Sequence, residues 1–205
     1  MSHDSFKEIH KYKKESIIKF GLISSNSSIN IKEIFTSYFK TLKEDKYKIK
    51  RENHYEFNPP NSPHLTISIV IMSSIDKIKE KYSNMNFFFL FIDMQDKNTI
   101  NFLDKSIDSI ISAGDECINK KCYIIGLYSS ETKVLSSQRA TTIIEAKGID
   151  YYFNEIKKDQ EMIKKFSKII DLIVNDANTI MIEKFLDQKH SELILDNSQS
   201  KCIIF

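Results

Sequence analysis

The 205-residue chain is long enough for one domain of ordinary size, and its 41% hydrophobic content is sufficient for a substantial core. Thirty Lys and Arg residues against 28 Asp and Glu residues give a net charge of +2, which argues against nucleic-acid binding through bulk charge. The three cysteines suggest no disulfide framework, and the N-terminus lacks the apolar core of a signal peptide, so we expect a cytosolic chain. No apolar run is long enough to predict a spanning helix.

The first part of the chain predicts a strand, a loop, a helix and a hairpin. Ser16–Ile23 is mostly apolar and predicts the first strand, and a Ser/Asn-rich loop follows it. Ile31–Leu42 carries apolar residues at helical spacing. Lys46–Phe57 alternates weakly and His64–Met72 is strongly apolar, with Asn58–Pro63 between them as the turn of a hairpin.

The stretch Phe87–Asp93 predicts the central strand, because it is apolar except for its last residue and contains no Gly or Pro. A short helical link over Ser73–Ser83 precedes it. Asn98–Ile111 predicts a helix with one apolar face, and Cys122–Leu127 predicts another buried strand. Strand, helix and strand form a right-handed crossover unit, in which ligands bind where the strands end.

The last part of the chain predicts a helix over Ser137–Lys147 that Gly148 terminates, a sixth strand over Ile149–Glu155, and a helix over Glu161–Ile173 that extends towards Leu186. We expect a flexible N-terminus over residues 1–14, a single domain over 15–186 and a polar tail over 187–205. The five histidines show no metal-ligand spacing, so we predict no structural zinc.

The order of these elements resembles that of Ras-like small GTPases. Asp93-Met-Gln-Asp and the helix after it are similar to the family segment in which a strand ends in Asp. Cys122–Ser130 and Tyr151–Lys157 fall where the family reads guanine, and Phe166 falls where the family keeps a Phe in its last helix. The resemblance implies an α/β G-domain with a six-stranded, mainly parallel sheet, one antiparallel hairpin strand and helices on both faces. The chain has no room for the extra helix of Rho proteins, so the Rab and Ras branches are the most similar.

The final residues, Cys202-Ile-Ile-Phe205, fit a C-a-a-X prenylation box, and a terminal Phe favours a geranylgeranyl group on Cys202. Because one lipid anchors weakly and the tail lysines hardly make a polybasic patch, we expect a protein partner as the second signal. The resemblance implies a protein that cycles between the cytosol and the cytoplasmic face of a membrane. Its implied partners are effectors, trafficking or signalling proteins and a prenyl-binding chaperone, and not nucleic acid.

Members of this family bind GTP or GDP with Mg²⁺ through the loop G-x-x-x-x-G-K-[S/T]. The corresponding positions here are Ser24, Ser25, Asn26, Ser27, Ser28, Ile29, Asn30, Ile31 and Lys32. No register supplies the two glycines, since Gly21 precedes the loop, and Lys32 is followed by Glu33 instead of a hydroxyl. We therefore interpret Lys32 as a solvated helical lysine. The serines remain candidate donors to an anion, and a helix-capping loop without a ligand is the alternative.

The other family motifs are altered as well. The third predicted strand ends in Ile69-Val-Ile-Met72, followed by Ser73, where the family has D-x-x-G and a catalytic Gln, so we predict no catalytic residue. Thr41 is the one candidate for the Mg²⁺-binding Thr of the first switch. The base-binding positions are Leu127, Tyr128 and Ser130, followed by Glu155, Ile156 and Lys157. Because a Ser cannot accept two hydrogen bonds from guanine, we expect the preference for guanine to be largely lost.

Two functions remain open on the sequence. The first is a prenylated pseudo-GTPase that acts as a membrane-associated binding module in vesicle traffic or signalling. The second is an atypical GTPase that still binds GTP or GDP and cycles slowly. An unrelated enzyme has little support, because no nucleophile set is present, and Asp93 and Asp96 are interpreted as caps of the following helix.

Overall fold

The computed structural model describes residues 17–26, 29–42, 47–51, 53–62, 65–81, 85–113 and 121–179. The predicted N-terminal segment 1–14, the tail 187–205 and its Cys202 lie outside the described residues, as do Ser27 and Ser28.

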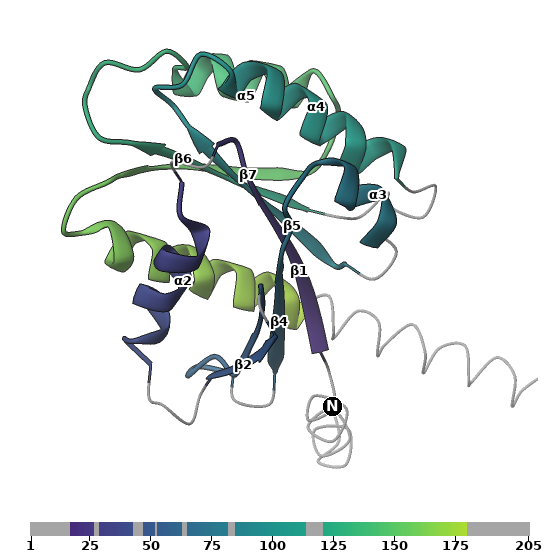
Figure 1. Cartoon of the computed structure of the whole chain (residues 1–205), viewed down its shortest axis with the longest axis vertical. Coiled ribbons are helices and arrows are strands. Elements are labelled where there is room, and N and C mark those ends of the chain that lie inside the picture. Colours follow the sequence, from purple (N-terminus) through teal and green to yellow (C-terminus); the bar gives the residue numbers. More distant parts are fainter. Residues whose placement is uncertain are drawn as a thin grey trace, which may run out of the picture.

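The described chain is an α/β structure with one seven-stranded, mostly parallel sheet, in the order β2-β3-β4-β1-β5-β6-β7 (Figure 1). The strands are β1 (Ile17–Ser24), β2 (Tyr47–Arg51), β3 (His54–Phe57), β4 (Thr66–Ile71), β5 (Phe87–Asp93), β6 (Cys122–Tyr128) and β7 (Tyr151–Lys157). Four adjacent pairs, from β4-β1 to β6-β7, are parallel. The pairs β2-β3 and β3-β4 are antiparallel.

The prediction of six strands is wrong by one, because the stretch expected as a single strand over Lys46–Phe57 forms both β2 and β3. The chain reverses between Arg51 and His54, which are paired across the turn. Asn53 has φ of 65°, a left-handed conformation that Asn adopts more readily than most residues. The predicted hairpin between β3 and β4 is present, with β4 at Thr66–Ile71.

The central position of β5 explains its unbroken apolar sequence. All seven of its residues are buried, and it pairs with β1 on one side and β6 on the other. Its side chains alternate between two cores: Phe87, Phe89 and Phe91 belong to one, and Phe88, Leu90 and Ile92 to the other. A strand that is apolar on both faces requires helices over both faces.

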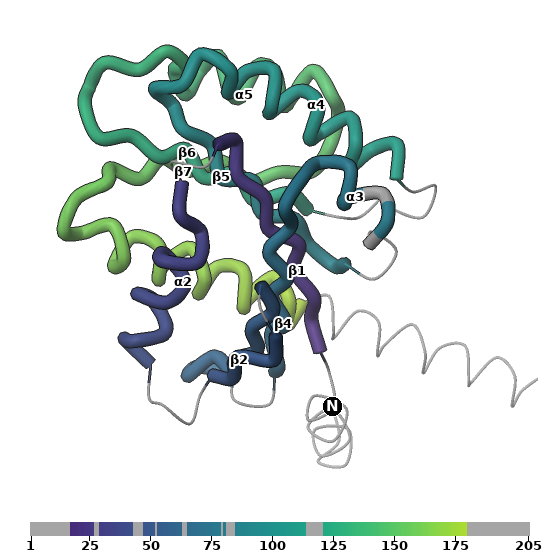
Figure 2. The backbone as a smooth tube through the Cα atoms, in the orientation of Figure 1, coloured from purple at the N-terminus to yellow at the C-terminus, as the bar shows by residue number. Residues whose placement is uncertain are grey.

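The helices supply this cover on both sides of the sheet. They are α2 (Ile31–Phe39), α3 (Asp76–Lys81), α4 (Thr99–Ser112), α5 (Ser137–Glu145) and a final helix over residues 162–179. Figures 1 and 2 show α3, α4 and α5 on one face, and α2 with the yellow-green final helix on the other. The two cores follow this division, since Phe35 of α2 and Phe166 of the final helix share one core, with their ring centroids 5.1 Å apart.

The element boundaries show where sequence patterns are imprecise. The first helix, α2, ends at Phe39 instead of Leu42. The last strand, β7, lies two residues later than predicted, because the buried Ile156 continues its alternation. The helix α5 ends at Glu145 instead of Lys147, and Gly148 lies in the turn after it, with φ of 68° and its N–H donating to the Glu145 carbonyl. Among the described residues, no helix is both long enough and apolar enough to cross a bilayer.

Candidate functional site

The parallel strands β1, β5, β6 and β7 have their carboxyl ends on the same side of the sheet, and the loops after them carry the predicted site residues. The turn from Asp93 to Asp96, directly after β5, joins these loops. The Asp93 N–H donates to the Ser25 hydroxyl (3.0 Å), and the Ser129 N–H donates to the Gln95 side-chain oxygen (2.9 Å). The structure therefore brings the predicted phosphate-loop and base-binding positions to opposite sides of one turn.

Three of the described amides in the predicted phosphate loop donate to backbone carbonyls of the chain itself. The Ser25 N–H donates to the Phe91 carbonyl (2.8 Å), and the Ile29 N–H donates to the Asn26 carbonyl (3.4 Å). The Ile31 N–H donates to the Ile29 carbonyl (3.1 Å). A phosphate-binding loop instead points several consecutive N–H groups at the ligand. In this conformation, three amides of the loop are directed at carbonyl groups and not at an anion.

The side chains of the same loop serve packing and capping. Ile29 and Ile31 are buried in the core that contains α2. The Asn30 side chain accepts from the Glu33 N–H (3.1 Å) and caps α2, as expected of a Ser/Asn-rich loop without a ligand. The Ser24 hydroxyl donates to the Asn26 carbonyl (3.2 Å), although a hydroxyl of this kind remains able to rotate.

A carboxylate lies beside this loop. The Asn26 side-chain amide donates to Asp96 Oδ2 (2.8 Å), and the Asn98 N–H donates to Asp96 Oδ1 (2.9 Å). Both hydrogen bonds lower the pKa of Asp96, and the bond from Asn26 has the larger effect. Asp96 is therefore ionised at neutral pH, and its negative charge opposes the binding of phosphate at Asn26.

The position after β4 is occupied by an apolar side chain. Met72 is 6% exposed, and its N–H donates to the Leu22 carbonyl (2.7 Å). Its terminal methyl lies 2.0 Å from where a Cβ on Gly21 would be, so the missing side chain of Gly21 is what makes room for Met72. Met72 joins the core beneath α3 and α4 and offers no ligand for Mg²⁺.

The two remaining candidates around the predicted phosphate site lie on or just after α2. The Thr41 hydroxyl, predicted as a stand-in for the Mg²⁺-binding Thr, donates to the Tyr38 carbonyl (2.6 Å) just past the end of α2. Lys32 lies in the first turn of α2 and is half-buried.

The predicted base-binding loop is bonded internally by Gln95. The Gln95 side-chain oxygen accepts from the Ser129 N–H (2.9 Å) and hydroxyl (2.6 Å), and its amide nitrogen donates to Ser130 (2.5 Å). The ring of Tyr128, one of the predicted base-binding positions, is covered by the ammonium of Lys133, 3.9 Å from the ring centroid. Ser130 and Tyr128, two of the predicted base-binding positions, therefore make contacts within the protein that stabilise the loop.

The other base-binding positions divide between core and surface. Leu127 and Ile156 are 2% and 1% exposed and belong to the hydrophobic core. The Glu155 carboxylate forms an ion pair with Lys133 and accepts from the Ser137 hydroxyl. Lys157 pairs with Glu131 (3.1 Å), which raises the pKa of Lys157.

The turn after β5 is the part of the site that sequence reasoning underrates. Asp93 and Asp96 were expected to cap α4, yet the N-cap of α4 is Asn98, and the two carboxylates accept from amides two residues further along the chain. Asp93 also pairs with Lys158 after β7 (3.5 Å). Three polar residues, Asp93, Gln95 and Asp96, at the end of a buried central strand are the available signal, because such a position faces the loops of both neighbouring strands.

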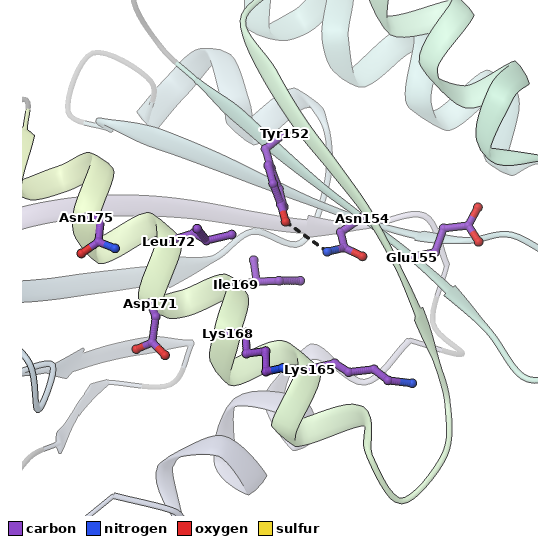
Figure 3. Close-up of a pocket in the computed structure, with 9 residues that line it drawn as sticks. All are labelled: Tyr152, Asn154, Glu155, Lys165, Lys168, Ile169, Asp171, Leu172 and Asn175. Carbon is purple, nitrogen blue, oxygen red and sulfur yellow. Dashed lines mark hydrogen bonds between the residues drawn. The ribbon is translucent and has the colours of Figure 1, made fainter.

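Three cavities lie elsewhere on the described surface, and none of these three is lined by the predicted phosphate loop. The first is a groove of about 470 Å³ between β7 and the final helix (Figure 3). Tyr152, Asn154 and Glu155 form one wall, and residues from Lys165 to Asn175 form the other. A second cavity of about 370 Å³ lies beside Arg51 and His54, and a third of about 590 Å³ lies between α3 and α4.

The described residues of the strand-end site offer hydrogen bonds, ion pairs and a covered aromatic ring. Within the described ranges, no group of three or more His, Cys, Asp or Glu side chains is placed to hold a metal ion. Cys122 is buried, and burial raises the pKa of its thiol, so it is not a nucleophile at neutral pH. No protein-family model matches the chain, and no curated protein matches it either.

Proposed function

We propose that this chain is a Ras-like protein of the Rab or Ras type that has lost nucleotide binding and acts as a membrane-associated binding module in vesicle traffic or signalling. The order β3-β4-β1-β5-β6-β7, with β3 antiparallel, supports the G-domain part of the proposal. It is the order that a Ras-like chain would show, with β2 added outside it. A strand order is shared by many functions, so the loss of nucleotide binding depends on the site.

The observation that carries the proposal is the state of the loop between β1 and α2. Its amides at Ser25, Ile29 and Ile31 donate to carbonyls of the chain. The ionised Asp96 is bonded to Asn26 in the same loop. To bind a triphosphate, the loop would have to break these bonds and place the ligand beside a negative charge. Neither change is compensated by glycines, which a phosphate loop uses to let its backbone approach the ligand.

The base-binding side supports the same conclusion. Recognition of guanine needs a carboxylate that accepts two hydrogen bonds, and Ser130 instead bonds to Gln95. Lys133 over the Tyr128 ring occupies a face that a base would need for stacking. A nucleotide would therefore lose contacts at both of its ends.

Fluorescence titration with mant-GTP and mant-GDP, each with and without Mg²⁺, tests the proposal on the full chain. We expect no saturable signal up to about 100 μM, a range in which a Kd of about 1 μM would be obvious. An excess of unlabelled GTP controls for nonspecific binding of the fluorophore. Binding at micromolar or tighter affinity that depends on Mg²⁺ would support the slowly cycling GTPase and overturn the pseudo-GTPase.

The membrane anchor is a separate part of the proposal and has a separate test. Mass spectrometry of the protein from cells is expected to show a geranylgeranyl group on Cys202, and the Cys202→Ser variant is the matched control. The lipidated protein is expected to move between membrane and cytosol with a prenyl-binding chaperone. Wild-type protein that carries no lipid on Cys202 and fractionates like the variant would remove the anchor without affecting the conclusion on nucleotides.

A further inference from the structure

The two edges of the sheet differ in how they are protected from pairing with another strand. At one edge, β2 exposes four of its five residues and carries Lys48, Lys50 and Arg51, and clustered cations of this kind discourage edge pairing. At the other edge, β7 begins with Tyr151, Tyr152 and Phe153 and contains no Pro. The first four residues of β7 therefore carry neither a charge nor a Pro, and its charged residues, Glu155 and Lys157, lie only towards its end.

The hydrogen bonds of β7 identify which of its backbone groups face outwards. The Cys122 N–H donates to the Asp150 carbonyl (3.0 Å), and the Lys158 N–H donates to the Tyr128 carbonyl (2.7 Å), so even-numbered residues bond to β6. Because the direction alternates along a strand, the N–H and C=O groups of Tyr151, Phe153 and Glu155 point to the open side. Among the described residues, no further strand pairs with these groups, so they can bond to an added strand.

The groove in Figure 3 runs along this open edge. Its floor is apolar, with Tyr152 of β7 facing Ile169 and Leu172 of the final helix, and Leu172 is 43% exposed. An exposed Leu beside an unprotected strand is a feature of surfaces that bind another chain. The edge and the groove form one continuous surface, which we call the β7 surface.

Positive and negative side chains lie towards opposite ends of the helix wall of the β7 surface, so two copies related by a two-fold axis can bring opposite charges together. The helix runs back along β7, and a strand advances about 3.3 Å per residue against about 1.5 Å for a helix. Tyr152 and Asn154 line the groove opposite Ile169 and Leu172, so the helix position level with Asn154 lies near Ile169. Lys165 and Lys168 lie towards one end of the groove from this level, and Asp171 lies towards the other.

We propose that the protein forms a symmetric dimer in which β7 pairs antiparallel with β7 of a second copy. A two-fold axis at Asn154 places Lys168 of each copy opposite Asp171 of the other, so both contacts are attractive. The same register pairs all seven strand residues and sets Phe153 opposite Glu155 and Tyr151 opposite Lys157, with no like charges opposed. This inference concerns the outer side of β7, which shares Glu155 and Lys157 with the predicted base-binding positions, and it does not depend on whether a nucleotide binds.

Analytical ultracentrifugation of the full chain from about 1 to about 200 μM tests the dimer, because symmetric contacts of this type span micromolar affinities. The wild type is expected to pass from monomer to dimer in this range. Lys168→Glu and Asp171→Lys each create two like-charge contacts, so each variant is expected to raise the dissociation constant about tenfold or more. Lys164→Glu, on the same helix but outside the groove, is the control and is expected to dimerise like the wild type.

A mixture of the two variants provides the decisive result. In the mixed dimer, one copy carries Lys168→Glu and the other carries Asp171→Lys. One contact then joins the introduced acid at position 168 to the introduced lysine at position 171, and the other joins the unchanged Asp171 to the unchanged Lys168. Both contacts are attractive, and no like charges meet. A 1:1 mixture is therefore expected to form a heterodimer more stable than either variant homodimer. Circular dichroism of each variant confirms that it is folded. A wild type that stays monomeric at every concentration, or a mixture that stays monomeric, overturns the proposal and leaves the groove to a different partner.

Discussion

Replacing Gly21 with Ala tests the interpretation that Met72 fills the space at the end of β4. The added Cβ would lie 2.0 Å from the Met72 terminal methyl and 3.0 Å from the Phe88 ring. Both side chains are almost fully buried, so Met72 has to move within a packed core, at a cost of about 1–3 kcal/mol. Reduced freedom of the unfolded chain offsets about 0.4–1 kcal/mol of this. We expect Gly21→Ala to destabilise the protein by about 0–2.5 kcal/mol.

The same substitution is expected to change sign when Met72 is first replaced with Ala. Met72→Ala alone removes buried methylene groups and costs about 2–5 kcal/mol. In that background, the methyl group introduced by Gly21→Ala enters the space that the Met72 side chain has left, and the remaining contact with Phe88 is tight but tolerable. Gly21→Ala then stabilises by about 0.4–1 kcal/mol. The double variant is therefore expected to be about 1–3 kcal/mol more stable than the sum of the two single effects predicts, and this difference is the coupling energy between the two positions.

Urea unfolding followed by circular dichroism measures the four free energies of this cycle, since the chain has no Trp for fluorescence. Coupling within about 0.5 kcal/mol of zero would refute the placement of Met72 beneath Gly21. It would mean that Met72 points elsewhere, and the end of β4 would then be open.

Three further predictions concern the loops and the final helix. The stabilising effect of Asp96 is present above the pKa of its carboxyl in the unfolded chain, and it is lost as the pH falls through the lowered pKa of the folded state. Asn26→Ala is expected to move the NMR titration midpoint of Asp96 up towards 3.8. An unchanged midpoint would contradict the hydrogen bond between Asn26 and Asp96. Gln95→Ala is expected to speed hydrogen exchange of the Ser129 amide about tenfold with little change in global stability, and unchanged exchange would show that Gln95 does not hold the loop. Asp176→Ala leaves the buried Tyr123 hydroxyl without its acceptor and is expected to lower the free energy of unfolding in urea by about 1–3 kcal/mol. Tyr123→Phe is expected to lower it by about 1 kcal/mol, because Lys121 still pairs with Asp176. Equal effects of the two variants would contradict this order.

The fold is largely predictable because its central elements have strong patterns. The stretch FFFLFID is apolar on both faces, so it fits only a strand between two layers of helices, which is where β5 lies. The reversal at Asn53 escapes prediction because no Gly or Pro marks it, and Asn adopts its left-handed conformation without either. The last strand lies two residues later than its prediction, because the charged residues near its end obscure the alternation that leads to Ile156.

The site is predictable in its location but not in its contacts. The positions after β1 and β6 do lie at one edge of the sheet, which follows from strand order alone. That Gln95 would bond to the loop after β6, and Asn26 to Asp96, depends on side-chain directions that no periodicity encodes. Ile29, Ile31 and Met72 are all buried, and which side chains fill the space beside the loop also depends on packing that no periodicity encodes.

Native mass spectrometry of the full chain with GTP or GDP and Mg²⁺ shows whether the protein binds a nucleotide at all, because it counts bound nucleotides without a label. After incubation with about 100 μM nucleotide, we expect only the mass of the free protein, with any adduct no more abundant for GTP than for ATP. A 1:1 complex with GTP or GDP that requires Mg²⁺ and excludes ATP would contradict the loss of nucleotide binding. It would show that the loop between β1 and α2 opens to hold a nucleotide despite its internal bonds.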